Sequence, residues 1–410
     1  MISKGFNMGG RFEKREFLKL ISSGLFAAGV WGMGASAKSA KAMEKSLLEA
    51  IETSDVEGAL KLLARSIRGG ADPWKIHLSL YPVVQRVLNP PFINPHLPKM
   101  YNICRELVSY LSKDKIAALV TLEVAEYARR PKMKKIRRAT LLTSPVAFKD
   151  IEIAIKGNDP EKVTVLMATF LDQKGGAELA RRVLLLGSGY LNNSLGHSVS
   201  CTAFILLEML ERRDQDSWPA LSTLADYFCK GIFHTIPELK KSTSLTEKQN
   251  PNRLMLRATS GRGIVNLHHP ITRYAIERVR KFFTQEEHDH MVNVWVEFMG
   301  DKREEEMSFG SIESEPVEDY GRFYETFSRL DAKRVVASLR GMISSEEGRH
   351  KLGRFIVQGL CDKYQGDYNP HYLTGLGSVL WIVDQYRDQP SIVANGLFQY
   401  LDFFFSGLRP

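Results

Sequence analysis

Apolar residues recur every three to four positions along almost the whole chain from residue 54 onward, which is the period of amphipathic helices. The first such stretch opens with Ser-Asp-Val-Glu at residues 54–57, a capping-box pattern, and an apolar face follows at residues 59–63. A second opens at residues 158–161, where Asn-Asp precedes a proline at the first helical position. No stretch alternates apolar and polar residues as a strand does, so the pattern predicts an all-α fold.

The predicted helices fall into units, each of which leads to a histidine at the start of a long helix. Helix starts at Asp55, Asp159 and Asp331 each lie about 40 residues before such a histidine, and a glycine-containing turn divides each interval. The three histidines are His96, His197 and His371. A further unit leading to His269 departs from this plan, because residues 240–262 are polar and show no opening helix.

The spacing of these histidines indicates a tandem duplication. His96 and His269 are 173 residues apart, and His197 and His371 are 174 residues apart. In the same registers, matching residues are Tyr101 with Tyr274, Arg105 with Arg278, Ser200 with Thr374, Leu206 with Leu380 and Ala220 with Ala394. We therefore expect a helical array of four pseudo-repeated units in two halves, residues 43–232 and 233–410, packed around a central histidine site. The alternative is chance similarity, since amphipathic helices share composition.

Composition changes this picture little. A chain of 410 residues with 44% hydrophobic content can bury a large core without covalent cross-links. The four cysteines lie far apart within predicted helices, which favours buried thiols over a disulfide framework or a zinc module. They are Cys104, Cys201, Cys229 and Cys361.

The net charge of +9 is concentrated in one segment. Seven basic residues fall within residues 129–138, and a compensating acidic run lies within residues 304–319. Both runs are expected to connect units, with contact to anionic lipid or an acidic partner as the alternative for the basic run. Aromatic residues are not interleaved with the basic ones, so nucleic acid is not an expected partner.

The first 42 residues have the organisation of an export signal. Lys-Arg-Glu-Phe-Leu-Lys at residues 14–19 resembles a twin-arginine motif with its first arginine replaced, and residues 20–33 form a short apolar stretch. Small residues at 35–37 or 40–42 offer a cleavage site. The apolar stretch is too short for a permanent span, so we expect a periplasmic protein without a stable transmembrane segment. An ordinary secretory signal is the alternative.

Histidines at helix starts are chemically suited to bind a metal. The positive end of the helix dipole disfavours the imidazolium, and a neutral imidazole is the form that ligates. We therefore predict a metal site formed by His96, His197, His269 and His371. Such a nitrogen-rich site suits non-haem iron, with copper, zinc or manganese as alternatives. His268 competes with His269, which the 173-residue register and the following Pro270 favour. Alternatively, all four histidines cap helices or bond to loops.

Other motifs in the sequence are weaker indications of a functional site. His288 and His290 follow a capping box formed by Thr284 and Glu287 and are expected at a solvated helix start. A serine-hydrolase elbow, G-x-S-x-G, is absent. Four repeat-related tyrosines are candidates to line a cavity, or are core aromatics: Tyr101, Tyr190, Tyr274 and Tyr364.

The short sequences around the four histidines resemble those of the questin oxidase-like family, and also helical regions fused to Rieske ferredoxins. These sequences are Asn94-Pro95-His96, Gly196-His197-Ser198, His269-Pro270-Ile271-Thr272 and Asn369-Pro370-His371. The resemblance covers residues 55–405 and implies O₂-dependent oxidation of an aromatic substrate by histidine-bound iron. The export signal and the missing Rieske segment depart from that pattern.

The sequence thus favours an exported oxidoreductase that contains a transition metal, iron. We expect it to act on a small-molecule substrate and to exchange electrons with a redox partner. A lysine or carboxylate ligand could complete the metal shell, but no motif locates one. The alternative is a non-catalytic periplasmic helical-repeat binding protein whose histidines are structural.

Overall fold

The computed structural model describes residues 37–212, 216–231, 235–239, 250–302, 304, 319–328, 343, 345–364, 366 and 369–407. These residues form helices joined by loops, with two isolated β-bridges and no strand among them, which confirms the predicted all-α fold. No helix in these ranges is both long and apolar enough to cross a membrane. The predicted export motif and most of the acidic run lie outside the described residues.

The chain divides into two compact units whose segments interleave along the sequence. The first comprises residues 1–80, 112–130 and 356–368, and the second comprises residues 81–111, 131–355 and 369–410. These boundaries differ from the predicted halves, residues 43–232 and 233–410. The predicted four-fold repeat is not confirmed and stays a prediction.

In the first unit, α2 (Ala37–Glu52) packs on α3 (Val56–Arg68), and both pack on α7 (Lys113–Arg129). The short α4 (Pro73–Ser79) also packs on α7. The capping pattern predicted at residues 54–57 is present, because the Asp55 side chain accepts a hydrogen bond from Gly58 N.

The second unit contains most of the helices. They are α5 (Tyr81–Val84), α6 (His96–Leu107), α8 (Phe148–Lys156), α9 (Pro160–Lys174), α10 (Gly176–Ser188), α11 (His197–Glu211), α12 (Trp218–Lys230), α14 (Pro251–Thr259), α15 (Gly263–Val279), α16 (Gln285–Met299), α17 (Tyr320–Ser328), α20 (His371–Gln385) and α21 (Pro390–Gly407). Helix α19 (Glu346–Lys363) has residues in both units.

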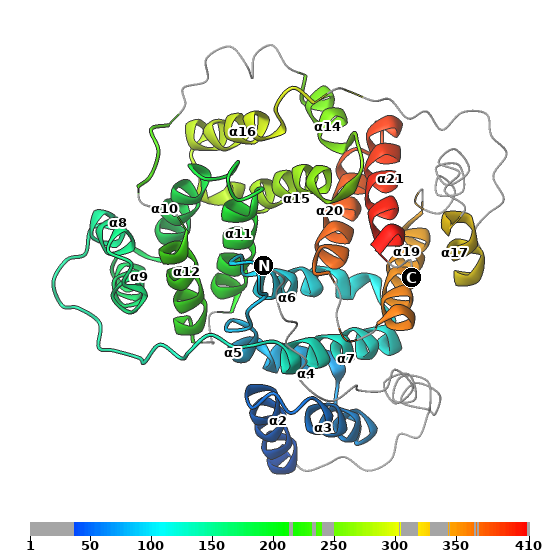
Figure 1. The fold of residues 1–410 in the computed structure, drawn as a ribbon, viewed down its shortest axis with the longest axis horizontal. Helices are drawn as coiled ribbons and strands as arrows, with labels where there is room; N and C mark the ends of the chain where they lie inside the picture. The colour runs from blue at the N-terminus through cyan, green and yellow to red at the C-terminus, as the bar shows by residue number, and fades with distance from the viewer. Residues whose placement is uncertain are drawn as a thin grey trace, which may run out of the picture. The chain divides into compact units, whose positions relative to one another are not determined.

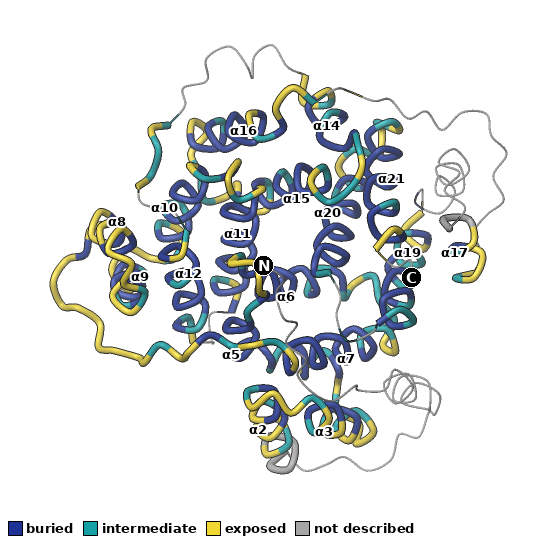
Figure 2. The backbone as a smooth tube through the Cα atoms, viewed as in Figure 1, coloured by how far each residue is buried: buried dark blue, intermediate teal, exposed yellow. Residues whose placement is uncertain are grey.

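Four helices form a closed ring at the core of the second unit: α11 packs on α6 and α15, and α20 packs on the same two helices (Figure 1). These four helices are buried along most of their length, whereas α8 is exposed on its outer side (Figure 2). Helices α10, α14, α16 and α21 cover parts of the ring. A helix buried on nearly every face needs apolar residues all round, and α11 and α20 have them.

One local prediction is wrong. Residues 240–262 were expected to carry no opening helix, yet α14 occupies residues 251–259. Asn250 caps this helix and Pro251 occupies its first turn, both of which favour helix initiation. Its buried residues are Leu254, Met255, Leu256, Ala258 and Thr259, and the polar residues around them obscure this buried face in the sequence.

Candidate metal centre

Three of the predicted histidines are the first residues of their helices. His96 begins α6, His197 begins α11 and His371 begins α20. Proline precedes His96 and His371, and its fixed φ prepares the chain to enter a helix. Gly196 precedes His197 with φ of +78°, a left-handed conformation that glycine adopts without steric cost. The prediction of histidines at helix starts is confirmed for these three.

The tertiary structure brings these three histidines into contact. The Nε2 atoms of His96 and His197 are 2.7 Å apart, and those of His197 and His371 are 3.3 Å apart. Ligand atoms of all three rings lie within 4.8 Å of one another, and all three residues are buried. His96, His197 and His371 can therefore hold a metal ion.

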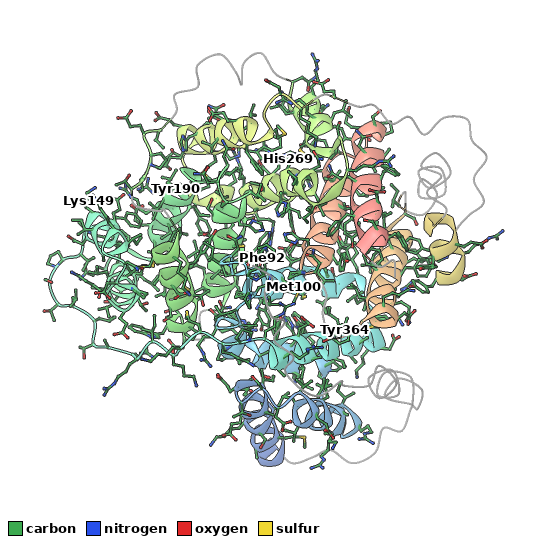
Figure 3. The ribbon with its side chains drawn as sticks, viewed as in Figure 1. Phe92, Met100, Lys149, Tyr190, His269 and Tyr364 are labelled. Atoms are coloured by element: carbon green, nitrogen blue, oxygen red, sulfur yellow. The ribbon has the colours of Figure 1, made fainter. Side chains whose placement is uncertain are left out.

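The fourth ring of the cluster belongs to His268 and not to the predicted His269. His268 Nε2 lies 3.2 Å from His197 Nε2 and 3.0 Å from His371 Nε2. The His269 ring instead packs edge-on against Phe298, and its Nδ1 lies 3.3 Å from Lys302 Nζ. Phe92 packs against the ring of His96, at the start of α6. In Figure 3, His269 is drawn well apart from Phe92, in agreement with its place outside the cluster.

The helix geometry explains this correction. Consecutive residues of an α-helix point about 100° apart, so only one of two adjacent histidines can face the ring interior. The prediction assumed that the helix begins at His269 because Pro270 follows. In the structure α15 begins at Gly263 and contains Pro270 in its interior, which puts His268 in the second turn.

Hydrogen bonds at Nδ1 orient all four rings: Nδ1 of His96 lies 3.3 Å from Asn89 Nδ2, and Nδ1 of the other three faces an oxygen. Nδ1 of His197 lies 2.6 Å from the Ser194 carbonyl oxygen, and Nδ1 of His268 lies 2.7 Å from the Ile264 carbonyl oxygen. Nδ1 of His371 lies 2.6 Å from Asn369 Oδ1. An oxygen acceptor requires a proton on Nδ1, so the Nε2 atom of each of these three neutral rings carries a lone pair toward the other histidines.

The environment keeps these rings neutral. Burial, followed by neighbouring positive groups, lowers the pKa of His197 and of His371 well below the usual histidine value. Burial also lowers the pKa of His268 to about 3. Neutral imidazole is the metal-binding form, so the cluster is ready to ligate at physiological pH without first losing a proton from these rings.

A buried lysine accompanies the cluster. Lys99 lies one turn after His96 on α6 and has no exposed surface. Its Nζ donates to Ser200 Oγ at 3.1 Å, which links α6 to α11. Burial lowers the pKa of Lys99, and the Lys99 charge contributes to the lowered pKa of His197, His268 and His371.

Exposed apolar side chains flank the cluster. Phe92 is 60% exposed, and its ring meets the His96 ring edge-on with centroids 5.9 Å apart. Three further exposed apolar residues each lie within three positions of a cluster histidine along the chain: Ile93, Leu195 and Val265. Chain connectivity keeps these residues, which we call the apolar rim, near the centre.

Several other predictions can be compared with the structure. His288 and His290 were expected to be solvated, but both are buried: His288 Nε2 lies 3.1 Å from Glu277 Oε1, and His290 Nε2 lies 2.9 Å from Ser188 Oγ. The capping box before them is present. They are buried because α16 packs on α10 and α15, and the sequence around these histidines does not reveal which helices pack there.

The repeat-related tyrosines behave mainly as core aromatics. Tyr101 accepts a hydrogen bond from buried Arg212, Tyr274 donates to Glu106, and Tyr364 donates to Glu126. None of the four cysteines forms a disulfide, and all four are buried, as predicted.

The sequence reasoning considered His268 but favoured His269, and it missed Lys99 altogether. For Lys99 a signal existed, because residues three apart share one helix face and His96 was already assigned to the interior. A charged residue at that position would have indicated a polar neighbour of the centre.

No family model, curated protein or solved structure matches this chain. The resemblance to the questin oxidase-like family therefore stays a hypothesis that rests on the short histidine motifs.

Proposed function

We propose that this chain is an exported oxidoreductase that binds a transition-metal ion, iron, at the Nε2 atoms of His96, His197, His268 and His371. One observation carries the metal site: the Nδ1 protons of three rings are committed to oxygen acceptors, so unprotonated Nε2 atoms face one another at 3.0–3.3 Å. Converging lone pairs repel, and a cation between them converts this repulsion into coordination.

The spacing of the rings supports the same conclusion. Metal–imidazole bonds of about 2.0–2.1 Å in tetrahedral geometry hold neighbouring nitrogens about 3.3 Å apart. The four measured Nε2 separations run from 2.7 to 3.3 Å, so small ring movements suffice to admit an ion. The Nδ1 hydrogen bonds to oxygen raise the basicity of the His197, His268 and His371 rings and hold their planes toward the ion.

Imidazole ligands suit iron, copper, zinc and nickel. A set of four imidazoles leaves two coordination positions open on a metal that prefers six ligands. When bound, such an ion supplies the redox chemistry and Lewis acidity that the surrounding side chains lack. The surrounding residues exclude water from the centre by burial, and the apolar rim favours a small aromatic or other apolar organic substrate, with O₂ as the oxidant.

Export to the periplasm is part of this proposal and rests on the sequence of residues 1–42. A twin-arginine signal suits the proposed function, because that route carries proteins whose cofactor is inserted before export.

Metal analysis of adjacent histidine variants tests the proposal. We expect about one transition-metal ion per chain in protein purified from the exported fraction. His268→Ala should weaken metal affinity by at least about 100-fold, because it removes a ligand. His269→Ala is the matched control: it removes the next residue, also buried, and should keep the full metal content.

The opposite result would refute the metal site. If the parent protein holds no stoichiometric metal, the metal site is refuted, and a loss of stability in His268→Ala would then indicate a structural role for the histidine. The chain would then be better described as a non-catalytic helical binding protein.

A further inference from the structure

Within the described part of the chain, no carboxylate balances the charge of Lys99 beside the candidate metal centre. Lys99 Nζ is fully buried, and within the described part of the chain its one hydrogen bond goes to Ser200 Oγ. It forms no ion pair with a described carboxylate. An ammonium has three protons to donate, so two of them lack an acceptor in these ranges.

Helix register predicts a second hydroxyl on the side of the centre, because Thr374 shares a face of α20 with His371. Ser200 lies three residues after His197, and Thr374 lies three residues after His371, as Lys99 does after His96. Residues three apart share one helix face, and helical side chains lean toward the N-terminus, where the histidines lie. Thr374 Oγ1 is buried and has no hydrogen-bond partner among the described residues.

The electrostatic argument follows from these positions. Neutral imidazoles bring no negative charge, so a bound divalent ion keeps its charge of about +2. The Lys99 ammonium adds another positive charge, and it acts on His197, His268 and His371. Buried charges of one sign are costly unless an opposite charge accompanies them. The described ring helices supply no carboxylate to Lys99 Nζ, and burial lowers the pKa of Lys99. An anion bound beside Nζ would favour the ammonium form and offset the positive charge.

We propose that Lys99 Nζ, Ser200 Oγ and Thr374 Oγ1 form a subsite for a singly charged anion beside the histidine centre. The anion bonds to the ammonium and the hydroxyls and offsets the charge of the metal. This inference rests on the proposed function, since the metal supplies part of that charge. Two sources share the chemistry: a free small anion, or an anionic oxygen carried on the organic substrate.

The test uses cobalt as a spectroscopic probe. Full-length protein is loaded with Co²⁺, its cobalt content is measured, and sodium azide is then titrated while the visible absorption of cobalt is followed. Lys99→Met should weaken azide binding about tenfold or more, because a hydrogen bond to a charged group is lost. Ser200→Ala should weaken it several-fold. The control Lys61→Met changes an exposed lysine of α3 and should leave azide affinity as in the parent.

A second arm separates the two sources of the anion. Formate and benzoate are titrated in the same way. Tighter binding of benzoate than of formate, lost in Lys99→Met, supports a substrate-borne anion, and the reverse order supports a free small anion.

Equal azide affinity in the parent and in cobalt-loaded Lys99→Met would overturn the subsite and leave the metal proposal intact. Failure of the parent to bind cobalt, which is measured before azide is added, would overturn both. If circular dichroism shows that Lys99→Met is unfolded, Ser200→Ala and Thr374→Val decide: unchanged azide affinity in both overturns the subsite, and weaker binding in either supports it.

Discussion

At the residue scale, the geometry of the centre depends on contacts made by the neighbours of the histidines. Gly196 is the clearest case. Its φ is +78°, and a Cβ atom at this position would lie 2.1 Å from Thr272 Oγ1, four residues after His268 on α15. The absence of a side chain at Gly196 thus sets how closely the start of α11 approaches α15.

Gly196→Ala should therefore destabilise the protein and weaken metal binding. The left-handed backbone costs about 1–2 kcal/mol for a residue with Cβ, and relief of the contact with Thr272 must move the start of α11. Gly263→Ala is a matched control, because φ there is +80° but a Cβ would meet nothing within 4 Å. Urea unfolding and a metal titration measure both effects. Equal losses of metal affinity in the two variants would contradict the argument.

Asn369 provides a second residue-scale prediction. Its Oδ1 accepts from His371 Nδ1 and also from His371 N, so it both orients the ring and binds the first backbone N–H of α20. Asn369→Ala should lower metal affinity about 10- to 100-fold, the usual effect of losing a partner of a metal-binding histidine. Asn250→Ala removes a cap from α14 alone and should leave metal affinity unchanged, although it too lowers stability.

At the scale of elements, the four ring helices depend on buried polar links as well as apolar packing. On α11, Glu208 is fully buried and accepts hydrogen bonds from Arg212, the C-cap residue of α11, and from Asn102 on α6. Arg212 is itself buried and donates to Tyr101 on α6. This network fixes how α6 and α11 lie against each other, between about one and four turns after the histidines.

Glu208→Leu should therefore be strongly destabilising. The substitution leaves the Arg212 guanidinium buried without its carboxylate, which costs about 3–5 kcal/mol when one partner of a buried pair is removed. Urea denaturation measures the loss. Glu57→Gln, in the exposed pair with Lys61, serves as the control and should have little effect. Comparable stability of the two variants would show that the network contributes little.

At the scale of the whole molecule, all four cluster histidines belong to the second compact unit. A ligand that binds only the folded state stabilises it by about 2.7 kcal/mol when its free concentration is 100 times its dissociation constant. A metal at this centre should therefore stabilise the second unit directly, since the ring helices α6, α11, α15 and α20 each contribute one ligand.

Removal of the metal by a chelator should accordingly lower the melting temperature of the parent and of His269→Ala, but not that of His268→Ala. Hydrogen exchange should locate the effect. In the metal-free protein, amides of α6, α11, α15 and α20 should exchange faster than in the metal-bound protein, whereas exchange in α2 and α3 should be unchanged. Uniform acceleration across both units would indicate that chelation acts on the protein as a whole and not through this centre.

The sequence alone determined the features that depend on neighbours along the chain. Periodicity predicted the all-α fold, and proline or glycine before a histidine predicted where α6, α11 and α20 begin, because helix initiation is decided within a few residues. Only the tertiary structure decided between His268 and His269, placed Lys99 in the interior, and buried His288 and His290. The physical reason is common to all of these: which side of a helix is buried depends on the helices packed around it, and those come from distant parts of the chain.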